Sequence, residues 1–158
     1  MPVQFGKVNG NFYCEDNQVV SLQGAPTRVG GNFWCGINQL VSLQGAPTQV
    51  GGNFYCNYNK LTSLQGAPTQ VGGDFYCDDN KLTSLQGAPG ELEGTFVCDY
   101  TSSLPLLQLL VYRSLKLFDA PILVKDILKK YQGTTNPGDI LRCASELNEA
   151  GFEGNAEW

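Results

Sequence analysis

Cysteine is the residue type whose spacing in this chain could do the most chemistry. Five of the six cysteines recur every 21 residues, and the sixth lies apart: Cys14, Cys35, Cys56, Cys77, Cys98 and Cys143. A zinc site made of thiolates needs cysteines that converge, often from short CxxC spacings, and the sequence has no such spacing. Each repeated cysteine follows a phenylalanine by two residues, which places both on one side of a short strand. We therefore interpret the cysteines as buried, reduced thiols, and we expect no metal and no cofactor.

Catalytic groups are scarce in the sequence. Histidine is absent, which removes the commonest general base together with the Ser–His and Cys–His pairs. The adjacent carboxylates Asp78 and Asp79 are expected at the end of a strand, where a solvated rim is favoured over an acid–base pair. Cys143 is predicted to lie in the core, on a helix face that also carries Ile140 and Leu147. The sequence thus predicts a protein that is not an enzyme.

A 21-residue repeat organises the chain up to about residue 103. A complete unit reads GGNFYCNYNKLTSLQGAPTQV, in which NFYCN alternates as a short strand. Glycine and proline in GAP and GG predict the tight turns that return the chain to its next coil. Repeated asparagines are predicted to bond backbone groups after each strand and to stack as a ladder: Asn17, Asn38, Asn59 and Asn80. Because one coil buries no core alone, we expect about five stacked coils with parallel strands.

This unit resembles the leucine-rich-repeat family, whose core is LxxLxLxxNxL. Phe54, Cys56, Asn59, Leu61 and Leu64 occupy the matching positions, with Phe and Cys replacing the usual Leu. The short SLQGAP return is similar to the bacterial type of repeat and to repeats of tailed phages. The resemblance covers about residues 3–103. It implies an α/β solenoid, a right-handed superhelix with one parallel β-sheet on its concave face and a C-terminal helical cap.

Residues 104–158 are predicted to form a three-helix cap that covers the open end of the repeat domain, residues 1–103. The first helix spans 104–118, with Ser103 as its N-cap. A second helix begins after Asp119 as N-cap, and its apolar stripe is Ile122, Val124, Ile127, Leu128 and Tyr131. The third helix begins at Pro137 after an Asn136 cap and stops at Gly151. Trp158 is expected to pack back on these helices.

Charge and hydropathy limit the partners. The net charge is −5 and only ten Lys and Arg are spread along the chain, so we expect no nucleic acid as a partner. The sequence has no apolar stretch near the roughly 18–20 residues that span a bilayer, so we expect no membrane contact. The start, MPVQFGKVNG, lacks the regions of a signal peptide. The expected location is the cytoplasm, which is the host cytoplasm if the protein is encoded by a phage.

The variable positions of the repeat predict a binding surface. They carry aromatic and acidic side chains that we expect on the solvent side of the strands and in the turns after them: Tyr13, Glu15, Trp34, Ile37, Tyr55, Tyr58, Tyr76, Asp78, Asp79 and Tyr100. Tyrosine and tryptophan are enriched in protein–protein hot spots, and carboxylates favour a partner with a basic surface. The sequence therefore predicts a non-enzymatic module that binds another protein through this face. By analogy with small acidic phage proteins, we expect it to block a host factor, such as a component of anti-phage defence.

Two other functions stay open from the sequence. The N-terminal end of the solenoid has little to cover it, so a homodimer that buries Phe5 and Val8 is one alternative. The other is a small-molecule or nucleotide site in the concave groove. Such a site needs a basic patch assembled from Arg28, Lys60 and Lys81.

Overall fold

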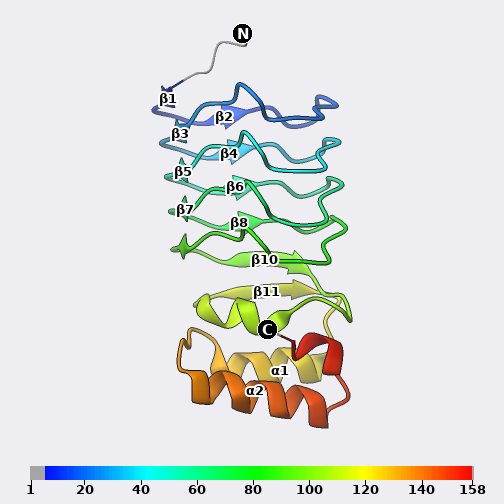
Figure 1. The fold of residues 1–158 in the computed structure, drawn as a ribbon. Coiled ribbons are helices and arrows are strands. Elements are labelled where there is room, and N and C mark those ends of the chain that lie inside the picture. The colour runs from blue at the N-terminus through cyan, green and yellow to red at the C-terminus, as the bar shows by residue number, and fades with distance from the viewer. Residues whose placement is uncertain (1–5, 158) are drawn as a thin grey trace.

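The computed structural model describes residues 6–157, and these form a β-solenoid followed by short helices. Figure 1 shows the coils stacked along one axis, with the first coil at one end and the helices at the other. The strands belong to two sheets, and every strand pair is parallel. The prediction of about five stacked coils with parallel strands is confirmed. The predictions for Phe5 and Trp158 concern residues outside the described part of the chain.

Sheet B contains the NFYC strands of the repeat. Its spatial order is β11-β10-β8-β6-β4-β2. The bounds are β2 (Phe12–Tyr13), β4 (Phe33–Trp34), β6 (Phe54–Tyr55), β8 (Phe75–Tyr76), β10 (Phe96–Asp99) and β11 (Leu115–Phe118). Each strand pairs in register with its copy, so that like residues stand one above another. This sheet carries the predicted binding positions.

Sheet A was not predicted, because the sequence analysis assigned one sheet to the stack of coils and tight turns to the GG segments. Its strands are β1 (Lys7–Val8), β3 (Arg28–Val29), β5 (Gln49–Val50), β7 (Gln70–Val71) and β9 (Glu91–Leu92). Val50 and Val71 point into the core, whereas the side chain of Gln70 lies on the outer side and donates to Glu91 Oε2 at 2.7 Å. Each strand of sheet A has only two residues, one pointing outward and one inward, and the same pair recurs in every coil.

A ladder of phenylalanines fills the core behind sheet B. Neighbouring rings from Phe12 to Phe96 stack with centroids 5.2–5.4 Å apart. Two residues after each phenylalanine, the thiols of Cys35, Cys56 and Cys77 are fully buried, and each donates to a backbone oxygen of the next coil at 3.2 Å. The expected placement of the repeated cysteines in the core is confirmed for these coils. A small side chain with a weak donor fits there, because the next backbone is close.

The asparagine ladder is confirmed for Asn38, Asn59 and Asn80, whereas the side chain of Asn17 donates only to Glu15 within the described residues. Asn59 Nδ2 donates to the backbone oxygens of Cys35 and Cys56 at 3.1 and 3.0 Å, so one amide joins two coils. Its Oδ1 accepts from the N–H of Leu40 at 2.9 Å. Asn38 and Asn80 make the corresponding bonds in their own coils. These side-chain amides pair with backbone N–H and C=O groups at the turn where the chain leaves the sheet. If those backbone groups were buried without a partner, they would reduce the stability of the fold.

Glycine is required where coils approach closely. Gly45, in the GAP turn, has φ +93°, and a Cβ there would lie 2.6 Å from the backbone oxygen of Leu22. Gly51 is held against the backbone of Gly30 in the preceding coil, where a Cβ would overlap its carbonyl. Gly45 thus permits the positive φ of the GAP turn, and Gly51 permits the close spacing between neighbouring coils.

The first predicted cap helix is wrong. Residues 104–118 form a 3-10 helix η1 (Leu106–Val111) and then strand β11, which adds to the end of sheet B. Four of the six residues of η1 are buried leucines, so most of the segment is enclosed and it lacks the broad polar face of an amphipathic helix. Within β11, Leu117 points inward and Lys116 outward, which is the alternation of a strand.

The last two helices are confirmed with changed details. Helix α1 (Ile122–Tyr131) begins after Pro121, and its side-chain cap is absent, so the Asp119 cap was wrong. Its buried stripe is narrower than predicted, because Ile122 is 78% exposed. Helix α2 (Pro137–Glu149) begins as predicted, since Asn136 Oδ1 accepts from the N–H of Gly138 at 2.8 Å. A short 3-10 helix η2 (Glu153–Asn155) follows.

The helix α2 also confirms two core predictions. Cys143 and Leu147 are fully buried, and Gly151 takes the left-handed conformation, with φ +85°, just past the end of the helix. Burial raises the pKa of Cys143 to about 11, so its thiol stays protonated at neutral pH. Among the helices of residues 6–157, none has the length and apolar content to cross a membrane.

Candidate functional site

The outward aromatic residues of sheet B stack as a second ladder. Tyr13, Trp34, Tyr55 and Tyr76 follow one another with ring centroids 4.4, 5.2 and 4.7 Å apart. Their planes are within 10° of parallel. The structure thus brings together four of the predicted binding residues. Stacking uses the ring faces inside the ladder, so the side chains present their edges to solvent.

Polar neighbours hold the ladder in place. Asn53 Nδ2 donates to Tyr55 Oη at 2.8 Å, and Tyr76 Oη donates to Asp74 Oδ2 at 3.1 Å. Burial, followed by the Asp74 carboxylate, raises the pKa of Tyr76 to about 12. The Tyr76 hydroxyl therefore remains protonated at neutral pH. This bracing gives the ladder a structural role of its own, besides any role in binding.

A column of left-handed residues runs beside the aromatic ladder, three positions later in each coil. Asp16, Ile37, Tyr58 and Asp79 all have φ between +51° and +53°. Ile37 and Tyr58 are 56% and 53% exposed. A β-branched or bulky residue is the least suited to this backbone region, which asparagine and aspartate tolerate well. The sequence predicted both residues as binding positions but gave no sign of their backbone conformation.

Carboxylates gather at the cap end of this face. Asp78 is only 8% exposed, and within residues 6–157 its Oδ1 has no hydrogen-bond partner. Burial raises the pKa of Asp78, and the nearby carboxylates of Asp99 and Asp79 add to the effect. Burial also raises the pKa of Asp99, whose Oδ2 accepts from the N–H of Asp79 at 2.6 Å. Glu15 lies apart from this group, in the first coil, and its Oε2 is buried as well.

Tyr100 does not belong to the candidate face. Its hydroxyl donates to Asn155 Oδ1 at 2.7 Å, and Asn155 Nδ2 donates to the backbone oxygens of Thr101 and Leu104. Tyr100 therefore ties the last coil to the C-terminal segment. The sequence placed it on the binding face because it follows Cys98 by two residues, and it did not anticipate that the chain turns into the cap there.

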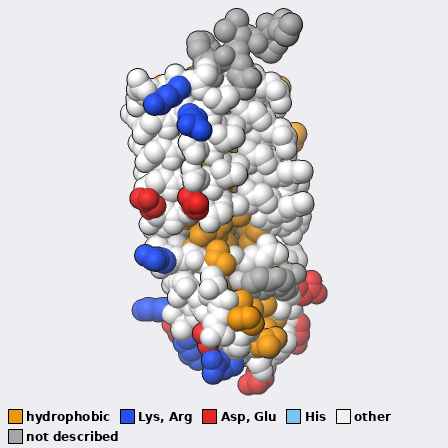
Figure 2. All heavy atoms as spheres, turned by 60° about the vertical axis from the view of Figure 1, so that its left-hand side comes forward, with side chains coloured by type: hydrophobic (Ala, Val, Ile, Leu, Met, Phe, Trp, Pro, Cys, Tyr) orange, Lys and Arg blue, Asp and Glu red, His pale blue; other side chains and the backbone are white. Residues whose placement is uncertain are grey.

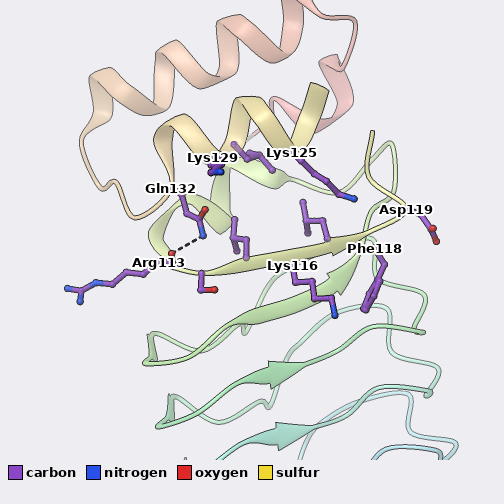
Figure 3. Close-up of a pocket in the computed structure, with 11 residues that line it drawn as sticks. Arg113, Lys116, Phe118, Asp119, Lys125, Lys129 and Gln132 are labelled. Carbon is purple, nitrogen blue, oxygen red and sulfur yellow. Dashed lines mark hydrogen bonds between the residues drawn. The ribbon is translucent and has the colours of Figure 1, made fainter. Parts of the chain in front are cut away.

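Basic residues are less evenly spread than the sequence suggested. Four of the ten Lys and Arg line one groove of about 590 Å³ between β11 and α1: Arg113, Lys116, Lys125 and Lys129. Figure 3 shows Lys125 and Lys129 projecting from α1 on one side and Lys116 from β11 on the other. In Figure 2, Lys and Arg side chains gather over the helical end of the molecule. The signal in the sequence was the i, i+4 spacing of Lys125 and Lys129 on one helix face.

The basic patch considered for a nucleotide is not assembled. Arg28 lies in β3 of sheet A, whereas Lys60 and Lys81 stand one coil above the other in the turn after sheet B. Lys60 Nζ donates to Gln39 Oε1 at 3.2 Å. Within the described part of the chain, His, Cys, Asp and Glu form no group of three that could hold a metal ion.

Comparisons with known proteins leave the family open. The geometry above shows a parallel β-solenoid with a 21-residue repeat and aromatic ladders. No family model, no curated protein and no solved structure matches this chain.

Proposed function

We propose that this chain is a solenoid of the leucine-rich-repeat type and that it binds another protein. The proposed contact surface, called the aromatic face below, consists of Trp34, Ile37, Tyr55 and Tyr58, flanked by Tyr13 and Tyr76 along the ladder. The single observation that carries the proposal is the placement of Ile37 and Tyr58. Both are large, half exposed and held in a left-handed backbone conformation.

Folding alone does not account for these two side chains. The same turn forms in the neighbouring coils with Asp16 and Asp79, so neither isoleucine nor tyrosine is needed to make it. A β-branched residue in this region costs on the order of 1–2 kcal/mol of backbone strain. More than half of each side chain faces solvent, which limits what packing returns. Backbone strain combined with exposed apolar area is typical of a site that binds another molecule.

The surroundings favour a partner with both apolar and basic groups. Trp34 and Tyr55 stack on each other in the same two coils that carry the exposed Ile37 and Tyr58, so each coil contributes an aromatic ring and a further large side chain to this face. Asp78, Asp79 and Asp99 lie at one end of the face. An arginine-bearing protein surface would find ring edges for packing and carboxylates for charge-assisted hydrogen bonds.

The test is an affinity capture from bacterial lysate with immobilised wild type and a double variant, Ile37→Asn and Tyr58→Asn. Asparagine suits the left-handed region, so the variant should fold at least as well as wild type. We expect a protein captured by wild type to lose about 30-fold in affinity for the variant, as removal of a hot spot of about 2 kcal/mol implies.

The matched control is Val20→Thr with Val41→Thr. These valines are 67% and 65% exposed, and the next two coils carry Thr62 and Thr83 at the same position. The control thus removes as many exposed apolar residues away from the aromatic face. Equal capture by wild type and the Asn variant, or equal loss in the control, would sink the proposal.

A further inference from the structure

Strand β11 is the last strand of sheet B, and one of its edges is free. The backbone N–H groups of Phe96 and Tyr100 in the preceding coil donate to Ser114 and Phe118 oxygens, both at 2.9 Å. In a parallel pair alternate residues bond to one neighbour, so the N–H and C=O of Leu115 and Leu117 point to the other side. No further strand of the described chain lies there. A free edge of this kind is a template for another strand.

One helix side chain already pairs with this edge. Gln132, at the end of α1, donates from Nε2 to the backbone oxygen of Arg113 at 2.9 Å. Arg113 has the same parity along the strand as Leu115 and Leu117, so its oxygen points to the same free side. Figure 3 shows this bond at the end of the groove. The edge is therefore accessible to a donor that comes from the groove, and the amide of Gln132 occupies the place of one strand donor.

The groove along this edge is basic. It is lined by Arg113, Lys116, Lys125 and Lys129, against one carboxylate, Asp119. Arg113, Lys116, Lys125 and Lys129 are exposed, and the protein as a whole has a charge of −5. A local excess of cations on an acidic protein draws an anionic ligand to this place.

The floor and the size of the groove favour a peptide. Leu115, Leu117 and Leu128 line it, and its volume of about 590 Å³ is within the usual range of ligand sites, roughly 300–1,000 Å³. The one aromatic ring, Phe118, has Lys116 Nζ 4.6 Å from its centroid, so that ring face is not free to stack on a base. A strand edge with an apolar floor and charged rims is the arrangement by which sheets take up extended peptides.

We propose that the groove between β11 and α1 binds an acidic peptide segment of another protein in extended conformation. The segment adds to the edge of β11, with its backbone paired to Leu115 and Leu117 and its carboxylates facing Lys125 and Lys129. Lys116 follows Val97 in the outward column of sheet B, so this site begins just past the acidic end of the aromatic face. The groove itself lies on the other side of β11, against α1. It does not depend on the function proposed for that face.

The first experiment measures binding of a fluorescent peptide of alternating Glu and Val by anisotropy, with alternating Lys and Val as the charge control. Two further peptides carry N-methyl groups on all Glu or on all Val residues. Only one of these two series has its methyl groups on the side that pairs with β11. We expect one series to bind at least about tenfold more weakly than the other, which corresponds to about 1.4 kcal/mol. Equal affinity of the two series would overturn strand pairing.

The second experiment tests the location with charge reversals. Lys125→Glu with Lys129→Glu changes two exposed residues of the groove, and Lys7→Glu with Arg28→Glu makes the same change in net charge on sheet A. We expect the groove pair to lose at least about tenfold in affinity and the control pair less than about twofold at moderate salt. Equal losses overturn the site. Tighter binding of a single-stranded oligonucleotide of equal charge overturns the choice of a peptide.

Discussion

The coils and the cap solve the same packing problem in different ways. In the coils a side chain contacts its own copy 21 residues away, as Phe54 contacts Phe33 and Phe75 with centroids 5.4 and 5.3 Å apart. In the cap each contact is made once. The transition between them imitates a coil, because Tyr112 stacks on Phe96 at 4.8 Å and β11 extends sheet B before the helices begin.

This difference tells which residues carry information about function. In the coils the scaffold is copied, so a residue that departs from its neighbours in the same column, such as Ile37 or Tyr58, is informative. In the cap there are no copies to compare, and only the geometry shows that Lys116 and Lys125 line the same groove. Candidate functional residues are thus found in the coils as departures from the repeat, and in the cap as side chains that line one groove.

The largest effect is expected from a substitution in the asparagine ladder. Asn59→Ala leaves the backbone oxygens of Cys35 and Cys56 and the N–H of Leu40 without their side-chain partner in the core. We expect a loss of about 3 kcal/mol in the free energy of unfolding, measured by urea denaturation. The matched control is Asn17→Ala in the first coil, where the exposed side chain donates only to Glu15 within the described residues. Similar losses at both sites would contradict the ladder's role.

The corresponding asparagine of the cap should matter less. Asn136 accepts one hydrogen bond, from the N–H of Gly138, at the exposed start of α2. We expect Asn136→Ala to cost about 1 kcal/mol, the usual effect of losing a helix N-cap. Urea denaturation of both alanine variants gives the comparison. A cost at Asn136 as large as at Asn59 would remove the distinction between copied and unique contacts.

A substitution at Asp78 separates charge from packing within the coils. Burial and neighbouring carboxylates raise the pKa of Asp78 in the folded state above its unfolded value. The protonated form therefore stabilises the fold, and this stabilisation is lost as the pH rises through the raised pKa. We expect Asp78→Asn, which copies Asn57 of the preceding coil, to raise the free energy of unfolding by about 1 kcal/mol near neutral pH.

The pH dependence is the check on that prediction. At a pH below the raised pKa the wild-type carboxyl is protonated in the folded state, so the advantage of Asp78→Asn should be smaller there than near neutral pH. Urea denaturation at the two pH values measures it. An advantage that is constant with pH would mean that packing, and not charge, separates the two proteins.

Much of the coil could be predicted from the sequence because the same contact recurs in several coils. The Phe and Asn ladders, the buried Cys56 and the outward Tyr55 all follow from period-two alternation and the 21-residue spacing. Sheet A was not predicted, because its two-residue strands, such as Gln49–Val50 and Gln70–Val71, are too short for sequence periodicity to distinguish a strand from a turn.

The cap and the site were harder to predict, for physical reasons that differ. The run of leucines in η1 hid the alternation of β11, although Leu115, Lys116 and Leu117 show it. The basic groove lies between strand β11 and helix α1, and composition does not reveal that the lysines of the two elements face the same groove. The aromatic face was predicted from residue types, but the bond of Tyr100 to Asn155 was not, because these two residues are distant in the sequence.

The central claim is that Ile37 and Tyr58 are retained at a cost to the fold. The most direct measurement is the free energy of unfolding of Ile37→Asn and of Tyr58→Asn, by urea denaturation and without any partner. We predict that each variant is more stable than wild type, by about 0.5–1 kcal/mol, because asparagine relieves left-handed strain. If either variant is less stable than wild type, that side chain serves the fold, and the account of the aromatic face is contradicted.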